Sequence, residues 1–222
     1  MLEKVKGGLI ISCQALKNEP LHSPFIMGRM AKAAKEAGAV GIRAQGVEDI
    51  IEIKSVTNLP VIGIIKRDYS DSEIYITATK KEVEELLESG CEMIALDCTN
   101  RKRPNDEKLS DLIDFIKKNG ILVMADISNY EEAINAQNLG VDCVSTTLSG
   151  YTPYTEKLDY PDFELVEKLV KELKVPVIAE GRINTPEDLK KVYDLGVHSA
   201  VVGSAITRPQ LIAKKFVDVI KK

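Results

Sequence analysis

The sequence predicts an α/β protein, a single (β/α)8 TIM barrel that spans residues 1–222. Short apolar runs alternate along the chain with segments that have helical spacing of apolar residues and charged outer faces. The runs lack polar alternation, which is typical of parallel strands buried on both faces. Glycines follow the helix-like segments at Gly38, Gly90, Gly140 and Gly196, and their spacing of about 50 residues corresponds to two βα units.

Eight strands are expected, each an apolar run that ends near a polar residue. They cover residues 9–13, 40–43, 61–66, 93–97, 123–127, 143–146, 177–180 and 199–202. Helical spacing is clearest at residues 81–88, 108–118 and 161–173. An open doubly wound sheet has similar strands and is the alternative, but eight units without a linker favour the closed barrel.

Composition excludes several classes of partner. The chain has 30 Lys and Arg against 34 Asp and Glu, and its net charge of -4 gives no general attraction to nucleic acid or to a membrane. The start of the chain has no signal-peptide pattern and the apolar runs are too short to span a bilayer, so a cytoplasmic protein is expected. The four cysteines lack C-x-x-C spacing and only two histidines are present, so we expect no disulfide framework, no metal site and no metal cofactor.

Polar side chains gather where the predicted strands end, which is the active face of such a barrel. In strand order they are Gln14, Arg43, Lys66, Asp97, Asp126, Thr146 or Thr147, Glu180 with Arg182, and Ser204. Charged groups at the end of apolar runs would be poorly placed if they were buried in hydrocarbon. The strand ends therefore predict one polar site.

Lys66 is a candidate general base or Schiff-base amine, because burial and the nearby Arg43 would lower its pKa. The alternative is a lysine that extends its charge to solvent. Glu180 lies directly before a glycine loop, where it has either a functional role or an ion pair with Arg182. Asp126 either caps the next helix or, as we expect, pairs with Lys66 and holds it in place.

Two further polar segments follow predicted strands, and their roles are harder to infer from the sequence. The basic residues at 101–103 are expected to form a solvated loop face. The segment 149–155 follows the sixth strand and acts either as a lid or as an ordered crossover.

The last two strands end at Gly181 and Gly203, each before a helix-like segment. Glycine lets backbone N–H groups approach an anion closely, and a helix start adds the positive end of its dipole. Ser204 and Arg208 lie beside the second glycine, and Arg208 either adds positive charge or simply begins a surface helix. This pair of loops predicts a phosphate site.

Several motifs occur together in one order along nearly the whole chain. They are Gln14, the run that begins at His22, Gly41-Ile-Arg-Ala44, Ile65-Lys-Arg-Asp-Tyr69, Ala125-Asp-Ile-Ser128, Ser149-Gly-Tyr-Thr152, Ala179-Glu-Gly-Arg182 and Val202-Gly-Ser-Ala-Ile-Thr-Arg208. With these motifs the chain closely resembles the N-acetylmannosamine-6-phosphate 2-epimerases. It departs at Ala78, where that family is expected to have proline, and this change should affect the rigidity of a loop rather than the chemistry.

The resemblance implies an isomerase that interconverts N-acetylmannosamine 6-phosphate and N-acetylglucosamine 6-phosphate in sialic acid catabolism, without a cofactor. The implied catalytic residues are Lys66 and Glu180. The residues implied to hold the sugar are Gln14, Arg43 and Asp126. Those implied to hold the phosphate are Gly181, Arg182, Gly203, Ser204 and Arg208.

Inversion at C2 of a 2-acetamido aldose requires an open ring, because the C2 hydrogen becomes acidic only beside a free aldehyde. A neutral Lys66 would take that proton. A Schiff-base aldolase or lyase that acts through Lys66 is the alternative, and a non-catalytic sugar-phosphate sensor is disfavoured because it would need a basic patch. Helix faces such as residues 163–173 fit packing within one subunit or across a homodimer.

Overall fold

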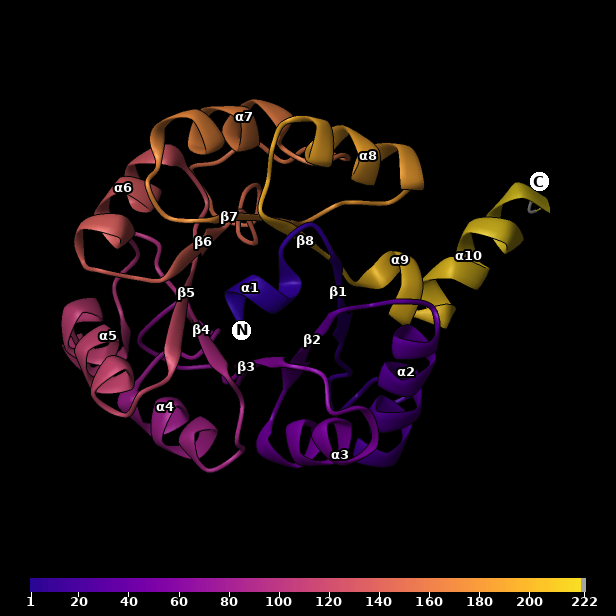
Figure 1. The fold of residues 1–222 in the computed structure, drawn as a ribbon, viewed down its shortest axis with the longest axis horizontal. Coiled ribbons are helices and arrows are strands. Elements are labelled where there is room, and N and C mark those ends of the chain that lie inside the picture. The colour runs from indigo at the N-terminus through magenta and orange to yellow at the C-terminus, as the bar shows by residue number, and fades with distance from the viewer. Residues whose placement is uncertain (221–222) are drawn as a thin grey trace.

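Eight parallel strands close into a barrel in the order β1 to β8, as a computed structural model that describes residues 1–220 shows (Figure 1). Each strand pairs with the next, and β8 pairs with β1, where Ile10 lies opposite Val201. The strands are β1 Leu9–Cys13, β2 Gly41–Gln45, β3 Val61–Ile64, β4 Met93–Asp97, β5 Leu122–Asp126, β6 Cys143–Ser145, β7 Val177–Glu180 and β8 Ser199–Val202. The predicted (β/α)8 barrel is confirmed, and the β8–β1 pairing rules out an open sheet.

Four strands, β1, β4, β7 and β8, have the predicted bounds, and the others differ by one or two residues at an end. One of the two-residue differences is in β3, which ends at Ile64 although a strand to Lys66 was expected. The chain turns there because Lys66 forms an isolated bridge with Ile76, so the segment between them folds back over the barrel mouth.

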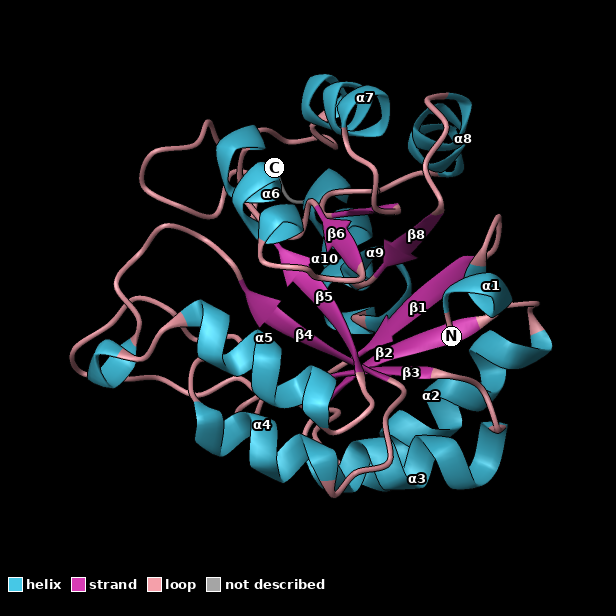
Figure 2. Cartoon of the chain, turned by 60° about the vertical axis from the view of Figure 1, so that its left-hand side comes forward, coloured by secondary structure: helices cyan, strands magenta, loops and turns pink. Residues whose placement is uncertain are grey.

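Helices lie outside the strands and follow them in sequence (Figure 2). They are α2 Pro24–Glu36, α3 Val47–Thr57, α4 Lys80–Leu87, α5 Leu109–Lys118, α6 Tyr130–Asn138, α7 Phe163–Glu172 and α8 Pro186–Asp194, with a 3-10 turn at Pro104–Asp106. Local signals fix their starts: Thr79 and Thr185 each form a capping box, and Asp162 accepts a hydrogen bond from the backbone N–H of Leu165. No helix within residues 1–220 is both long and apolar enough to cross a bilayer.

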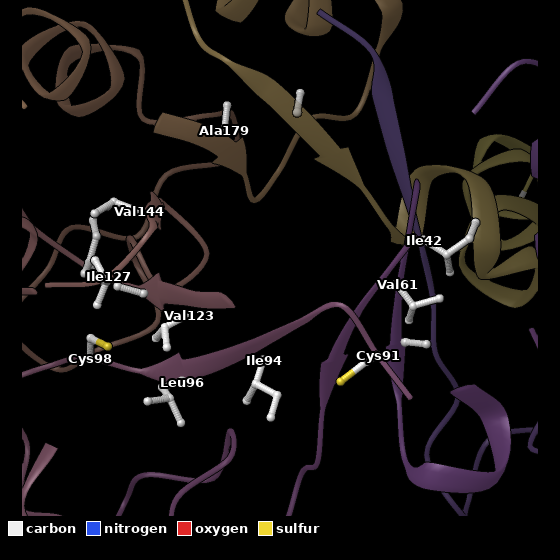
Figure 3. Close-up of a cluster of buried hydrophobic side chains, with 14 of the residues drawn as sticks. Ile42, Val61, Cys91, Ile94, Leu96, Cys98, Val123, Ile127, Val144 and Ala179 are labelled. Carbon is white, nitrogen blue, oxygen red and sulfur yellow. The ribbon is translucent and has the colours of Figure 1, made fainter. Parts of the chain in front are cut away.

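The core has two layers, because alternate residues of each strand face inward and outward. On β4, Ile94 and Leu96 face the helices and join the outer layer, part of which Figure 3 shows. Met93 and Ala95 face the barrel axis and join the inner layer. The same alternation decides which polar residues at the strand ends can point into the barrel.

The N-terminal end of the barrel is closed by a short helix, α1 (Leu2–Val5), which the sequence did not predict. Figure 1 shows α1 in the centre of the ring of strands. Val5 is fully buried in the inner layer, and the backbone oxygen of Leu2 lies 3.1 Å from Nε2 of His198. His198 therefore lies at this end, away from the strand ends that carry the polar residues.

The chain ends in two helices after β8, α9 (Ser204–Thr207) and α10 (Pro209–Ile220). Figure 1 shows α10 extending away from the barrel instead of packing along it. None of its residues is buried, and several large apolar side chains are exposed. These are Leu211, Phe216, Val217, Val219 and Ile220.

Candidate active site

A cavity of about 320 Å³ opens at the carboxyl ends of the strands. Its size falls in the lower range for pockets that hold small molecules. Nine of the ten predicted site residues line it: Gln14, Arg43, Lys66, Glu180, Gly181, Arg182, Gly203, Ser204 and Arg208. The exception is Asp126. The predicted convergence of strand ends on one site is therefore observed for these nine residues.

Arg43 holds together the floor of the cavity. Alternation along the strands turns Arg43 on β2, Asp126 on β5 and Glu180 on β7 inward, since Ile42, Ala125 and Ala179 beside them belong to the outer layer. The guanidinium binds both oxygens of Asp126, at 2.5 and 3.0 Å, and donates to Glu180 Oε2 at 2.9 Å. Arg43 and Asp126 are 1% and 0% exposed, so this is a buried ion pair.

The predicted pairing of Asp126 with Lys66 is wrong. Both oxygens of Asp126 bind Arg43, and Oδ1 also accepts a hydrogen bond from Thr147 at 2.7 Å. Asp126 lies below the cavity and is connected to it through Arg43 and Thr147, which both line it. Strand alternation places Arg43, and not Lys66, opposite this carboxylate.

Lys66 lies just beyond β3 with its side chain largely buried at the wall of the cavity. Burial lowers the pKa of its amine to about 8, and the positive charges of Arg43 and Arg208 contribute in the same direction. Among the residues the structure describes, no acceptor lies within hydrogen-bonding distance of its Nζ. The neutral form of this amine is therefore far more populated near pH 7 than that of an ordinary lysine, as expected for a base.

Glu180 has the opposite perturbation. Burial raises the pKa of its carboxyl to about 7, and the charge of Asp126 adds to this rise while Arg43 opposes it. Two carboxylates share one guanidinium, so one of them retains a proton more readily. The cavity thus combines an amine that can be neutral with a carboxyl group that can be protonated.

Arg182 does not form the ion pair with Glu180 that was the alternative for that residue. Its guanidinium donates to the carbonyl oxygens of Ser149 at 2.6 Å and Gly150 at 3.0 Å. It also lies over the ring of Tyr151, 4.2 Å from the centroid. Two of its nitrogens are thus bound to the loop after β6, and the role of this side chain in holding phosphate stays a prediction.

The predicted phosphate loops differ from each other. Gly181 has a φ of 105°, which favours glycine, but α8 begins only at Pro186, so no helix starts at this glycine. After β8, Gly203 leads directly into α9, a helix of four residues. Arg208 reaches the same cavity and forms an ion pair of 3.1 Å with Glu19.

Sequence reasoning missed several residues of the site. Ser12 accepts a hydrogen bond of 2.7 Å from Gln14, and Tyr75 lines the wall beside Lys66. Ser12 could have been found, because alternation along β1 turns the position one residue before the strand end inward. Tyr75 and Glu19 come from loops whose course no local pattern reveals.

The expected solvated loop at residues 101–103 is wrong for two of its three members. Arg101 binds Asp97 at 2.6 Å, and Arg103 is 5% exposed and donates to the backbone oxygen of Ala78 at 2.9 Å. Lys102 is exposed. Asp97 is therefore bound by Arg101 at the base of this loop and does not line the cavity.

A (β/α)8 barrel that combines a lysine of lowered pKa with a carboxyl group of raised pKa in one cavity defines an enzyme that moves protons on a small polar substrate. The model of the family described as "Putative N-acetylmannosamine-6-phosphate epimerase" matches residues 27–222. The chain belongs to this family.

Relatives of known name cover the whole chain. A protein of Clostridioides difficile strain 630, named "Putative N-acetylmannosamine-6-phosphate 2-epimerase", is 77% identical over all of this chain and 99% of its own length. One of the same name from Clostridium perfringens strain SM101 is 68% identical over the full length of both.

Solved structures agree with this assignment. The N-acetylmannosamine-6-phosphate 2-epimerase from Clostridium perfringens superposes with a TM-score of 0.98 at 68% identity, over 99% of this chain and 96% of that one. The thiamine phosphate pyrophosphorylase from Pyrococcus furiosus, with a TM-score of 0.60 at 18% identity over 99% of both chains, shares the fold alone.

Proposed function

We propose that this chain is an isomerase that interconverts N-acetylmannosamine 6-phosphate and N-acetylglucosamine 6-phosphate by moving the proton at C2. The observation that carries the proposal is the Lys66 amine, whose pKa is lowered to about 8 at the wall of the cavity. The names of the relatives supply the substrate.

The reaction needs the open-chain sugar, in which C1 is an aldehyde. The Glu180 carboxyl group, with its pKa raised to about 7, is suited to transfer protons at the C1 and C5 oxygens while the ring opens, taking one from the C1 hydroxyl and giving one to the C5 oxygen. Neutral Lys66 then takes the C2 proton, and the C–H electrons form a C1–C2 double bond as negative charge develops on the C1 oxygen. Return of a proton to the other face of C2 gives the epimer, and this proton comes from Glu180, or from Lys66 after the intermediate has turned its other face toward the amine.

Arg43 is placed to stabilise the developing charge. Its Nη atoms hold the two carboxylates, so its positive charge is fixed at the floor of the cavity. A positive charge fixed beside the substrate stabilises an oxyanion at little cost in reorganisation. The carboxylates of Asp126 and Glu180 keep the guanidinium in this orientation.

The phosphate group is assigned to the end of the cavity formed by Gly181, Gly203, Ser204 and Arg208. The two glycines leave backbone groups accessible to an anion, and Arg208 supplies a positive charge. Arg208 donates to Glu19 through Nη2 alone, so its other N–H groups remain able to bind phosphate.

Turnover in heavy water tests the function. The epimer formed from N-acetylmannosamine 6-phosphate should carry deuterium at C2, as read by NMR or mass spectrometry, and the Lys66→Ala variant should form none. Product without deuterium at C2 would exclude proton exchange with solvent. Borohydride trapping of a substrate adduct on Lys66 would instead indicate Schiff-base chemistry.

We also propose that the enzyme is a homodimer in which α10 contacts the second copy. The support is the exposed apolar surface of α10, where Phe216 is 73% exposed and Ile220 is 81% exposed. Such a contiguous apolar surface is typical of a protein contact. We place the activity in the cytoplasm because a charged sugar phosphate does not cross an apolar bilayer unaided. The family resemblance implies a role in sialic acid catabolism.

A further inference from the structure

Arg182 connects two loops of the barrel mouth. It follows β7, yet its guanidinium donates to two successive carbonyl oxygens in the loop after β6, those of Ser149 and Gly150. Its plane lies over the ring of Tyr151 at 4.2 Å. Both Arg182 and Tyr151 line the cavity. A side chain with three contacts to one short segment fixes where that segment lies.

The backbone on both sides is adapted to this contact. Arg182 has a φ of 53°, a left-handed conformation that only a few per cent of non-glycine residues adopt. Gly150 has a φ of 70°, and a Cβ atom built on it would lie 2.9 Å from Nη2 of Arg182. The guanidinium thus lies against a position where there is no room for a larger residue.

The rest of the segment is also fixed. The hydroxyl of Ser149 donates to Asp162 at 2.7 Å, and that of Tyr154 donates to Glu132 at 2.7 Å. The backbone N–H of Gly150 donates to the hydroxyl of Thr155 at 3.0 Å. Such a tethered loop fits an ordered wall better than a lid that opens freely.

We infer that Arg182 is a positioning residue, which holds Tyr151 as a preformed wall of the cavity and acts on the reaction through that ring. The inference rests on the proposed function for its kinetic test, but its structural test does not need activity. A preformed wall lowers the cost of ordering the site when substrate binds.

A double-mutant cycle separates this role from direct binding of phosphate. Arg182→Gln and Tyr151→Ala should each raise KM about tenfold with a smaller effect on kcat. In the Tyr151→Ala background, Arg182→Gln should add less than about a twofold further change, because its effect passes through the missing ring. Effects that multiply, together with a weaker inhibition by inorganic phosphate in Arg182→Gln alone, would overturn the inference in favour of a phosphate contact.

Hydrogen exchange gives a readout that is independent of turnover. In Arg182→Gln, the amides of Gly150 and Tyr151 should exchange about tenfold faster than in the wild type, while the amides of α5 are unchanged. Arg29→Gln is the matched control, because Arg29 lies over the ring of Phe25 at 4.8 Å on α2, outside the cavity. Unchanged exchange at Gly150 and Tyr151 in Arg182→Gln would overturn the inference, whereas a wild type that forms no epimer would defeat the proposed function alone.

Discussion

Arg43 and Asp126 face each other across the barrel, from β2 and β5, and form a two-pronged ion pair with both side chains buried. Desolvation makes such a pair expensive unless its geometry and remaining hydrogen bonds are good. Here Thr147 and Glu180 complete it. The pair therefore sets the orientation of the guanidinium and, through it, the acidity of Glu180.

Asp126→Asn should test this relationship. It leaves Arg43 with one carboxylate and should lower the free energy of unfolding at pH 7 by about 3 kcal/mol. The pKa of Glu180 should fall, because one cause of its elevation is removed. Urea unfolding gives the first quantity and NMR titration of Glu180 the second.

Asp194→Asn is the control for stability, since Asp194 forms an exposed ion pair with Lys190. This variant should change the free energy of unfolding by less than about 1 kcal/mol. An Asp126→Asn protein as stable as the wild type would mean that the buried pair contributes nothing to folding.

Lys66→Met should lower kcat by at least about 100-fold, as expected for the loss of a general base. The same variant should be more stable than the wild type at pH 7, by on the order of 2 kcal/mol. In the folded state the pKa of Lys66 is about 8, below its ordinary value of 10.5, so charging it is unfavourable there.

The sign of this effect depends on pH. The unfolded chain binds more protons than the folded one between pH 8 and 10.5, so wild-type stability gains from Lys66 as pH rises through that window. The advantage of methionine should therefore shrink above pH 8 and vanish above 10.5. Thermal unfolding at several pH values measures it, and an advantage that does not vary with pH would point to packing instead of charge.

The rate should depend on the same amine. kcat/KM should rise with pH as free Lys66 loses its proton, with an apparent pKa of about 8. Arg208→Gln removes a positive charge that lowers this pKa, so the rise should move to higher pH while KM increases. Rate profiles of both proteins from acid to alkaline pH give the comparison.

Lys190→Gln, which removes an exposed cation on α8, should leave the profile in place. A profile that also stays in place in Arg208→Gln would show that Arg208 does not act on Lys66.

Phe216→Glu should convert the proposed dimer into monomers, because it places a charge in the apolar surface of α10. Light scattering coupled to size-exclusion chromatography reads the mass directly. Lys214 on the same helix forms an exposed ion pair with Asp218, and the control variant Lys214→Gln should leave the dimer intact. A wild-type protein that is already monomeric at micromolar concentration would refute the contact.

Strand order, closure and most site positions could be predicted from the sequence because they depend on local patterns. An apolar run that ends at Lys66 or Glu180 places those residues at the barrel mouth whatever surrounds them. Partner choice is different. Whether Asp126 binds Arg43 or Lys66 depends on which inward positions share a layer, and that requires the register between strands that are far apart in the sequence.

Long loops were the other limit. The interpretation of the 101–103 segment as solvated failed because acceptors from Asp97 and Ala78 meet Arg101 and Arg103 there. Arg182 was assigned by its place after Gly181, although its contacts are made in another loop. Charge in a loop indicates an interaction, but only the folded chain shows with what.

The short helix at Leu2–Val5 covers the end of the barrel opposite the cavity, and Val5 joins the inner layer of buried side chains there. Substrate and product must therefore enter and leave through the same opening, at the carboxyl ends of the strands. Product has to leave before the next substrate binds, so each sugar phosphate should inhibit turnover of the other competitively.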